Sequence, residues 1–430
     1  MRARGIILVG GGSKGTRFRP LSFDLPKPLV PLAGKPMITH HLEGLARVPN
    51  LLDVLLLGFY DESLFAEFIE SASARLQMTV RYVREGAALG TAGGLLRYRE
   101  AVEAGSPDVL FILHCDIASS FPLCDMLAFH QRRGRSLTVL GKRITGDTRA
   151  YGCIVKDERT DELLHYAEKP ETAVSALINC GVYVASTRGF YALLEAADQE
   201  RARGLAAQRL WVASAEGERG RVQIEQDIIM TYEGRQQIYV YECDDFWCQV
   251  KSPEAALRAS AMYLQHYAST QPELLAPHSH GMEARAVRNM RADGLNYGRD
   301  SVNVSHAAPT FVGNVYVHPT ARVAATAKLG PNVSVAAGCV VGDGARLVNC
   351  MALEDSRIGE HALVRNAVVG WGSTVGEWAR VEGDDLTAEA GGRISILGAN
   401  VECAGEIVVR NCTVLPHKAL TVSALNQIIL

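Results

Sequence analysis

The residues that could do chemistry begin with a glycine-rich stretch near the start of the chain. Residues 9–20 read Val-Gly-Gly-Gly-Ser-Lys-Gly-Thr-Arg-Phe-Arg-Pro, directly after the apolar run 5–9, and a Pro-Lys-Pro string follows at 26–28. Glycine amides at the end of a strand can close around phosphate oxygens, because no Cβ stands in the way. Arg17 and Lys27 add the full positive charges that a polyphosphate requires. The glycines alone could equally form a tight turn, and the two cations favour the phosphate interpretation.

A carboxylate that could hold a divalent cation follows the apolar run 109–113, in the string Leu-His-Cys-Asp that ends at Asp116. In a displacement at phosphorus, Mg²⁺ commonly neutralises the charges of the incoming and departing groups. Carboxylate oxygens are the ligands that such an ion needs. Asp116 is therefore the candidate metal ligand, and Mg²⁺ is the expected cofactor if the protein is catalytic. The alternative is an aspartate that only caps a helix or a turn.

The elements that must position these residues alternate between strands and helices up to about position 265, which is typical of an α/β domain with a mainly parallel sheet. Apolar runs predict strands at 54–58, 80–83, 109–113 and 137–140. Helical stretches are expected at 37–46, 63–74 and 122–132. Because ligands bind beyond the carboxyl ends of parallel strands, we expect the glycine loop and Asp116 to share one site.

A polar connector is expected at 269–310, and a different periodic pattern of apolar residues follows it. Aliphatic residues recur at every sixth position, with two single-residue slips, at Val317, Val323, Leu329, Val335, Val341, Leu347, Leu353, Ile358, Val364, Val369, Val375 and Val381. This period is typical of a parallel β-helix, in which each aliphatic side chain points into a narrow core. Residues 383–393 break the period and are expected to project as a loop. We therefore predict one domain at 1–268 and a β-helix domain at 311–430.

The composition excludes several classes of protein. With 430 residues, 48% of them hydrophobic, the chain is long enough for two globular domains. Its formal net charge of −3 gives no reason to expect nucleic acid or an acidic membrane as a partner. No apolar run reaches the roughly 18 residues of a membrane span, and we expect a cytoplasmic protein without a signal peptide. The ten cysteines show no Cys-x-x-Cys spacing and are expected to be reduced.

Several strings, taken in their order, resemble the sugar-phosphate nucleotidyltransferase family. The family's loop reads Gly-Gly-x-Gly-Thr-Arg-Leu-Arg-Pro before Pro-Lys-Pro, and its later strings are matched by Leu-Gly-Thr-Ala-Gly at 89–93, Tyr-Gly at 151–152, Glu-Lys-Pro at 168–170 and Asn-x-Gly at 179–181. Within the family the chain most resembles the eukaryotic GDP-mannose pyrophosphorylases, which share its Val-Gly-Trp at 369–371 and Val-Leu-Pro-His-Lys at 414–418. This resemblance covers both halves. It implies a Rossmann-like nucleotidyltransferase domain with a mixed, mainly parallel sheet, followed by a left-handed parallel β-helix of hexapeptide repeats.

The resemblance also implies a role for each matched residue. The residues that would act on the phosphates are Arg17 and Lys27, and the metal ligand would be Asp116. The nucleotide would contact Gly10, Gly11, Gly15, Thr16, Glu85, Gly90 and Thr91. The sugar and its phosphate would contact Gly152, Glu168, Lys169, Asn179 and Gly181.

Two departures from the family pattern bear on catalysis. The loop is two residues longer than usual, because Gly-Ser-Lys at 12–14 stands where the family has one residue. In addition, Gln249 occupies the place of the aspartate that is the family's second metal ligand. A glutamine carbonyl brings no negative charge, and Lys251 nearby adds repulsion, so we expect the metal to be held weakly or not at all. Asp244 or Asp245 could substitute for the missing carboxylate.

Both departures are those of the alpha, regulatory-type subunits of this subfamily. The resemblance implies a subunit that binds GDP-mannose and inhibits a catalytic beta-type partner when GDP-mannose is abundant. One alternative is an active guanylyltransferase that converts GTP and mannose 1-phosphate into GDP-mannose and pyrophosphate, and another is a non-catalytic assembly subunit. Edges of the β-helix are expected to support homo-oligomers or hetero-oligomers. The loop 383–393 is a candidate contact with the partner.

Overall fold

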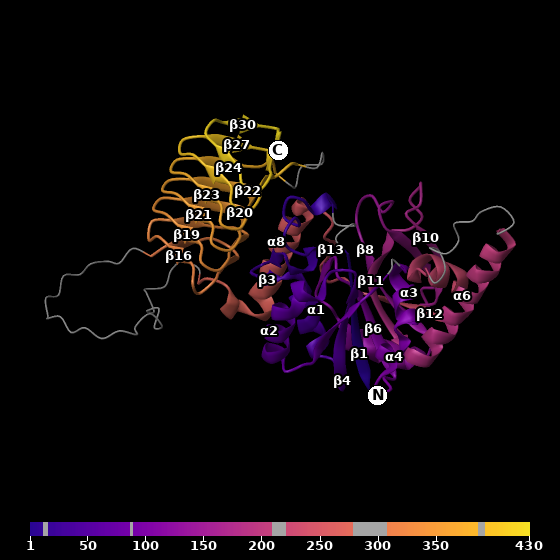
Figure 1. Ribbon diagram of the computed structural model, residues 1–430. Helices are drawn as coiled ribbons and strands as arrows, with labels where there is room; N and C mark the ends of the chain where they lie inside the picture. Colours follow the sequence, from indigo (N-terminus) through magenta and orange to yellow (C-terminus); the bar gives the residue numbers. More distant parts are fainter. Residues whose placement is uncertain (12–15, 87–88, 209–220, 278–307, 386–391) are drawn as a thin grey trace, which may run out of the picture. The chain divides into compact units, whose positions relative to one another are not determined.

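The computed structural model describes residues 1–11, 16–86, 89–208, 221–277, 308–385 and 392–430 (Figure 1). By its contacts the chain divides into two units. The first consists of Met1–Thr16, Asp24–Val30 and Pro36–Val250, and the second of Arg17–Phe23, Pro31–Lys35 and Lys251–Leu430. The expected boundary at residue 268 falls inside helix α8 (Pro253–Thr270), which belongs to the second unit. Most of the expected connector at 269–310 lies outside the described residues.

The first unit is built on a mixed sheet whose strand order is β10-β9-β11-β6-β1-β4-β5, with β8 paired to β11 and β12. These strands are β1 (Ala3–Gly10), β4 (Leu51–Gly58), β5 (Val80–Arg84), β6 (Val109–His114), β8 (Leu137–Arg143), β9 (Gly152–Lys156), β10 (Leu163–Glu168), β11 (Leu177–Ser186) and β12 (Ile238–Glu242). The neighbours β6-β1-β4-β5 are all parallel, and β8 and β12 also run parallel. Strand β11 runs antiparallel to β6 and β8. The predicted strands and the α/β class are confirmed.

Helices cover both faces of this sheet because successive residues of each strand point to opposite sides. Ile6 packs in one apolar cluster with residues of α3 (Gly90–Arg97) and α6 (Thr187–Gln208). The next residue, Ile7, packs in another with residues of α1, α2 and α5. Figure 1 shows α1 and α2 on one side of the strands and α3 and α6 on the other. The helices of the second cluster are α1 (Met37–Ala46), α2 (Ala66–Leu76) and α5 (Leu123–Arg133), which lie at the predicted places.

The strand order reverses at β1, since β4 lies on one side of β1 and β6 on the other. In open parallel sheets the crevice beyond the carboxyl ends of the strands at such a point is where ligands bind. Here β1 ends at Gly10 and β6 ends at His114, two residues before Asp116. The sheet therefore brings the start of the glycine loop, at Gly10 and Gly11, and Asp116 to the same edge.

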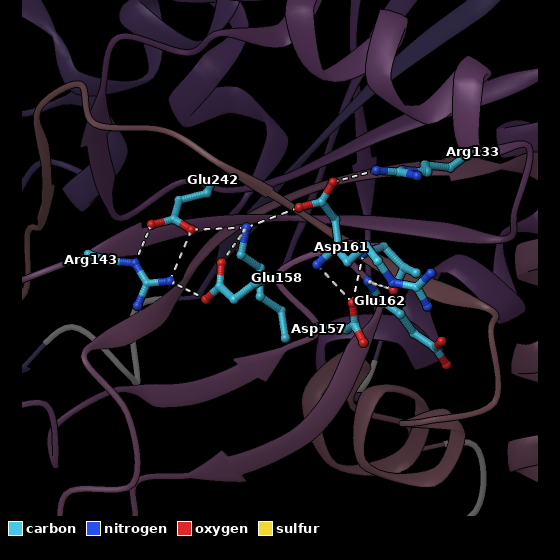
Figure 2. A network of polar contacts seen from close by, with 10 residues as sticks. Arg133, Arg143, Asp157, Glu158, Asp161, Glu162 and Glu242 are labelled. Carbon is cyan, nitrogen blue, oxygen red and sulfur yellow. Dashed lines mark hydrogen bonds and ion pairs between the residues drawn. The ribbon is translucent and has the colours of Figure 1, made fainter.

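A charged cluster joins several strands on the other flank of the sheet (Figure 2). Lys156, whose side chain is only 8% exposed, lies 3.0 Å from Asp161 and 3.1 Å from Glu242. Glu242 also pairs with Arg143 at 2.6 Å, and Asp161 pairs with Arg133. Burial lowers the pKa of Lys156, but its two carboxylate partners outweigh burial and raise it above its ordinary value. The cluster ties β8, β9 and β12 together, and none of its members is a predicted site residue.

Within the second unit, α8 carries part of the N-terminal region. The helix begins with Pro253 after Ser252, whose side chain accepts from an amide of the first turn. Strand β2 (Pro31–Leu32) lies against α8, and the amide of Ala33 donates to Oγ of Ser260 at 3.0 Å. Gly34 has a φ of +83°, and a Cβ at this position would lie 2.1 Å from the ring of Tyr316. The turn after β2 therefore needs a glycine for both its backbone angle and its space.

The rest of the second unit is the predicted parallel β-helix, which is left-handed. Partners in adjacent coils are the inward residues of the sequence pattern, such as Leu329 with Leu347, Leu347 with Val364, and Val364 with Val381. The hexad aliphatics from Leu329 onward are buried, and Val317 and Val323 are partly buried. The strands of three or more residues are β15 (Val315–Val317), β18 (Val333–Val335), β20 (Arg346–Ala352), β22 (Leu363–Val369), β24 (Arg380–Glu382), β25 (Ser395–Leu397) and β27 (Val408–Arg410). Two-residue strands, among them β16 (Arg322–Val323), β19 (Val340–Val341), β21 (Arg357–Ile358) and β23 (Thr374–Val375), form a second parallel sheet.

The loop at 383–393 interrupts one coil. Val381 pairs with Val364 of the preceding coil and with Val409 of the following one, so the pairing continues in register on both sides of the insertion. The base of the loop is closed by the amide of Asp384, which donates to the carbonyl of Arg393 at 2.7 Å. The side chain of Asn411 donates to Asp384 at 2.9 Å. Residues 386–391 lie outside the described residues.

Within the described ranges, no helix is long and apolar enough to cross a membrane. All ten cysteines are free thiols, and seven of them are buried. The expectation of unpaired cysteines is confirmed.

Candidate functional site

The glycine loop begins where β1 ends. Gly10 has a φ of +69°, and its carbonyl accepts from the amide of Phe59 at 2.8 Å. A Cβ on Gly11 would lie 2.7 Å from Cβ of Phe59, so this position also requires a glycine. Gly15 and the rest of 12–15 lie outside the described residues, and Thr16 is exposed. The structure thus places the start of the predicted phosphate loop at the carboxyl edge of the sheet.

The two cations of this region belong to different units. Arg17 is exposed and lies in the short helix Thr16–Phe18, where it counts among the residues of the second unit. Lys27 belongs to the first unit, and its side chain is only 12% exposed. Its Nζ lies 3.4 Å from Oδ2 of Asp116. The predicted phosphate-binding lysine is therefore ion-paired with the predicted metal ligand.

A short two-stranded antiparallel sheet brings the strand that carries Gln249 next to the segment that follows Asp116. Strand β7 (Ile117–Ser119) follows Asp116 and pairs with β13 (Trp247–Gln249), in which Gln249 lies opposite Ile117. The amide of Val250 donates to the carbonyl of Asp116 at 2.8 Å. Gln249 therefore lies on the strand beside the segment that follows Asp116, and its neighbour Val250 is the residue bonded to the carbonyl of Asp116.

Asp245 does not substitute for the missing carboxylate. Its Oδ2 accepts from Oγ of Ser120 at 2.7 Å, at the end of this two-stranded sheet that lies away from Asp116. Ser120 is four positions beyond Asp116, which corresponds to roughly 13 Å of extended chain. Asp244 is one position further from Gln249 along the chain, and its carbonyl accepts from Lys142.

These residues do not fit a magnesium site. Mg²⁺ requires oxygen ligands with net negative charge, and this position offers one carboxylate and one neutral amide, with an ammonium group 3.4 Å from the carboxylate. Across the ranges that the structure describes, no three His, Cys, Asp or Glu side chains are grouped so as to hold a metal ion. We therefore derive no step through a metal.

The predicted nucleotide segment forms the start of α3. Gly90 has a φ of +82°, and a Cβ there would lie 2.4 Å from the carbonyl oxygen of Val222. Thr91 accepts from the amide of Ile224 at 2.8 Å and donates to Glu225 at 3.1 Å. Glu85 is buried beside Gly94, which lies in α3. The segment is thus clamped against residues 222–225, while 87–88 lie outside the described residues.

The predicted sugar segment is held by tyrosine hydroxyls. Tyr166 donates to Oε2 of Glu168 at 2.7 Å, and Lys169 pairs with the other oxygen of this carboxylate. A Cβ on Gly152 would lie 1.9 Å from the hydroxyl of Tyr166, so only glycine leaves room for this contact. Asn179 donates to the hydroxyls of Tyr166 at 3.3 Å and Tyr183 at 2.9 Å. The structure thereby brings Gly152, Glu168 and Asn179 together.

Gly181 lies in a bulge of β11, where the register against β8 shifts. Its φ is +73°, and its amide donates to Oδ1 of Asn179 at 2.9 Å. A Cβ on this residue would lie 3.3 Å from the ring of His114. The bulge turns the side chain of Asn179 toward the tyrosines.

Residues that the sequence analysis missed lie at the centre of this arrangement. Glu225 accepts from Tyr183 at 2.9 Å and lies 3.3 Å from Nε2 of His114. His114 gave no signal beyond its position two residues before Asp116, and Glu225 gave none either, because the segment 222–229 mixes polar and apolar residues and also holds Asp227. The segments therefore meet through a buried carboxylate.

The environment of Glu225 keeps it ionised. Burial alone would raise the pKa of Glu225, but the ion pair with His114 and the hydrogen bond from Tyr183 outweigh burial and lower it to about 2. Burial alone would lower the pKa of His114, but the same pair outweighs burial and raises it. The pKa of Tyr183 is well above its ordinary value, mainly because the hydroxyl is buried and also because it lies beside the charge of Glu225. Tyr183 is therefore a protonated donor to an anionic acceptor.

This pair predicts a pH-dependent stability. The pKa of Glu225 falls from the ordinary 4.5 to about 2, so its stabilisation is complete above pH 4.5 and is lost as the pH falls toward 2. The shift corresponds to about 3 kcal/mol. Because His114 must carry its proton, the pair also weakens as the pH rises through the raised pKa of this histidine. We expect the difference in free energy of unfolding between wild type and Glu225→Gln, measured in urea, to shrink steadily below pH 4.5. A difference that is constant down to pH 3 would contradict the ion pair.

The family of this chain follows from two family models that match it. The family model described as "Nucleotidyl transferase" matches residues 4–265, and the model described as "GMPPB C-terminal domain" matches residues 311–430. The chain belongs to the nucleotidyl transferase family.

Within this family, the chain is similar over its whole length to regulatory subunits. It is 41% identical to the mannose-1-phosphate guanylyltransferase regulatory subunit alpha of Papio anubis and to that of Homo sapiens, in each case over 99% of this chain and 100% of the relative. The subunit of the same name from Dictyostelium discoideum is 38% identical over 99% of this chain and 98% of its own length. The chain thus groups with the regulatory alpha subunits, as the sequence resemblance predicted.

Proposed function

We propose that this chain is a regulatory subunit of a cytoplasmic mannose-1-phosphate guanylyltransferase. It binds GDP-mannose and, when GDP-mannose is abundant, inhibits a catalytic beta-type partner. The names of its relatives support the regulatory role, since they are called regulatory subunits. Ten free thiols support a reducing compartment.

One observation carries the proposal, namely the contrast between the two halves of the site. The residues proposed for the sugar, Gly152, Glu168 and Asn179, are joined by hydrogen bonds and close contacts with tyrosine hydroxyls. At the metal position, by contrast, Gln249 replaces a carboxylate and Lys27 pairs with Asp116. Loss of a metal ligand removes transition-state stabilisation without removing the groups that bind the sugar. Such a site favours binding over turnover.

Calorimetry and kinetics on the purified chain test this. We expect saturable binding of GDP-mannose, together with turnover of GTP and mannose 1-phosphate at least about 100-fold below that of a catalytic relative, by the scale of one lost metal ligand. Gln249→Asp should raise the affinity for Mg²⁺ and the rate, whereas Gln249→Asn should raise neither. Rapid turnover by the wild type, unchanged in Gln249→Asp, would instead support an active guanylyltransferase.

The partner is tested by capture and by the mass of the complex. A tagged chain should retain a catalytic beta-type subunit, and GDP-mannose should lower the rate of the assembled enzyme more than that of the beta-type subunit alone. A complex whose rate does not respond to GDP-mannose, formed by a chain that does not bind this ligand, would support a purely structural assembly subunit. The same masses would distinguish homo-oligomers from hetero-oligomers.

A further inference from the structure

A continuous series of hydrogen bonds runs through the first unit from the nucleotide segment to the sugar segment. It starts at Thr91 on α3 and passes through Glu225 to Tyr183. It continues from Tyr183 to Asn179, whose amide also donates to Tyr166, and ends at Glu168, the expected acceptor of sugar hydroxyls. We call this set the tyrosine network, and its members are Thr91, Glu225, Tyr183, Asn179, Tyr166 and Glu168. They come from α3, the segment 224–229, β11 and β10, so residues far apart in the sequence depend on one another.

Carboxylates close the tyrosine network in two places, and this fixes the direction of every hydrogen bond between them. An ionised carboxylate can only accept, so Tyr183 must donate to Glu225 and Tyr166 must donate to Glu168. Each tyrosine oxygen is then left as an acceptor, and the two N–H groups of Asn179 fill these places. The amide oxygen of Asn179 consequently faces the amide of Gly181. Only one orientation of the Asn179 side chain satisfies all of these contacts.

We propose that Glu225, Tyr183 and Tyr166 are positioning residues for the sugar half of the site. The fixed directions of their hydrogen bonds lock the orientation of Asn179 and hold the carboxylate of Glu168 toward the sugar hydroxyls of the ligand. This inference rests on the proposed binding of GDP-mannose and deepens it. Tyr183 is fully buried, and its oxygen bonds to protein groups as both donor and acceptor, so it acts through Asn179 and Glu225.

The tyrosine network makes a different prediction for ligands with and without a sugar. Tyr183→Phe removes the link between Glu225 and Asn179, and the amide of Asn179 becomes free to turn. We expect its affinity for GDP-mannose to fall about ten-fold, the scale of one lost hydrogen bond in a network, while its affinity for GDP stays within about two-fold of wild type. Tyr166→Phe should behave in the same way. Because both act on Asn179, the double variant should lose less than the product of the two single losses.

Isothermal titration with GDP-mannose and with GDP, at fixed pH and temperature, measures all of these affinities. The matched control is Tyr191→Phe, which removes another buried tyrosine hydroxyl, one that donates to the carbonyl of Leu95 outside the tyrosine network. It should leave both affinities unchanged. Circular dichroism melting curves confirm that each variant is folded before titration.

The possible outcomes distinguish a failure of the positioning role from a failure of the proposed function. A wild-type chain that binds GDP-mannose no more tightly than GDP refutes sugar-nucleotide sensing, and the positioning role with it. A wild type that prefers GDP-mannose while Tyr183→Phe keeps the full preference refutes the positioning role alone. Equal losses for GDP and GDP-mannose in Tyr183→Phe show a loosened unit rather than a positioning role, and also overturn the inference. A ten-fold loss restricted to GDP-mannose supports it.

Discussion

Replacement of Arg4 by methionine will lower the free energy of unfolding by about 3–5 kcal/mol, because it leaves a buried carboxylate without its main partner. Nε of Arg4 pairs with Asp53, and both side chains are less than one-tenth exposed. Nη1 of Arg4 also donates to the carbonyl of Ala101 at 2.7 Å and to that of Val102. This single side chain therefore ties β1 to β4 and to the end of α4 (Arg99–Glu103). Equilibrium unfolding in urea, followed by circular dichroism, measures the loss.

The chain offers a matched control for this change. Arg81 pairs with the other oxygen of Asp53, but its side chain is 46% exposed. Arg81→Met should cost about 1 kcal/mol or less, since exposed ion pairs are screened by water. Equal losses for the two variants would show that burial of Arg4 does not set the energy of this cluster.

Alanine at Gly370 is expected to destabilise the β-helix by about 3 kcal/mol, because the added Cβ meets backbone that cannot move aside. Gly370 follows β22, and its Cβ would lie 2.2 Å from the carbonyl oxygen of Gly398 and 2.5 Å from that of Leu397 in the next coil. Register pairs hold the same two coils together, for example Val369 with Leu397. Separating the coils at one corner would strain these pairs. Thermal unfolding of the full chain measures the effect.

Gly86→Ala serves as the control for Gly370→Ala. A Cβ at Gly86 has open space around it, and no positive φ demands a glycine there. The free energy of unfolding should change by no more than about 0.5 kcal/mol. If Gly370→Ala unfolds at the same temperature as Gly86→Ala, the coils can separate more easily than the contact distances indicate.

Most of the fold could be predicted from periodic patterns in the sequence. The sixfold spacing predicted the inward aliphatics of the β-helix because each coil repeats one environment, and the structure pairs Leu329, Leu347 and Val364 across successive coils. The loop at 383–393 was predictable for the same reason, since it breaks a strict period. No pattern in the sequence indicated that helix α8 belongs to the second unit, because its contacts with β2 and β20 depend on tertiary packing.

The candidate site was predictable only where local strings mark it. The family pattern related Asp116 to Gln249, and the antiparallel β7 and β13 place Gln249 opposite Ile117, the residue after Asp116. The ion pair of His114 with Glu225 joins positions far apart in the sequence, and no spacing rule connects them. Likewise, the pairing of Lys27 with Asp116 depends on how distant segments converge at the edge of the sheet. Contacts of this kind are set by the packed sheet, so a single sequence gives no direct view of them.

The segments that make up the second unit limit how domains can be exchanged between relatives. Arg17–Phe23 and Pro31–Lys35 belong to that unit by their contacts, although they lie in the first tenth of the chain. Ala33 is bonded to Ser260, and Gly34 packs on Tyr316. A β-helix exchanged between relatives at a single junction near residue 250 would leave these two N-terminal pieces facing a foreign surface. The two halves of this protein are therefore not interchangeable modules, and any chimera must transfer three pieces of chain together.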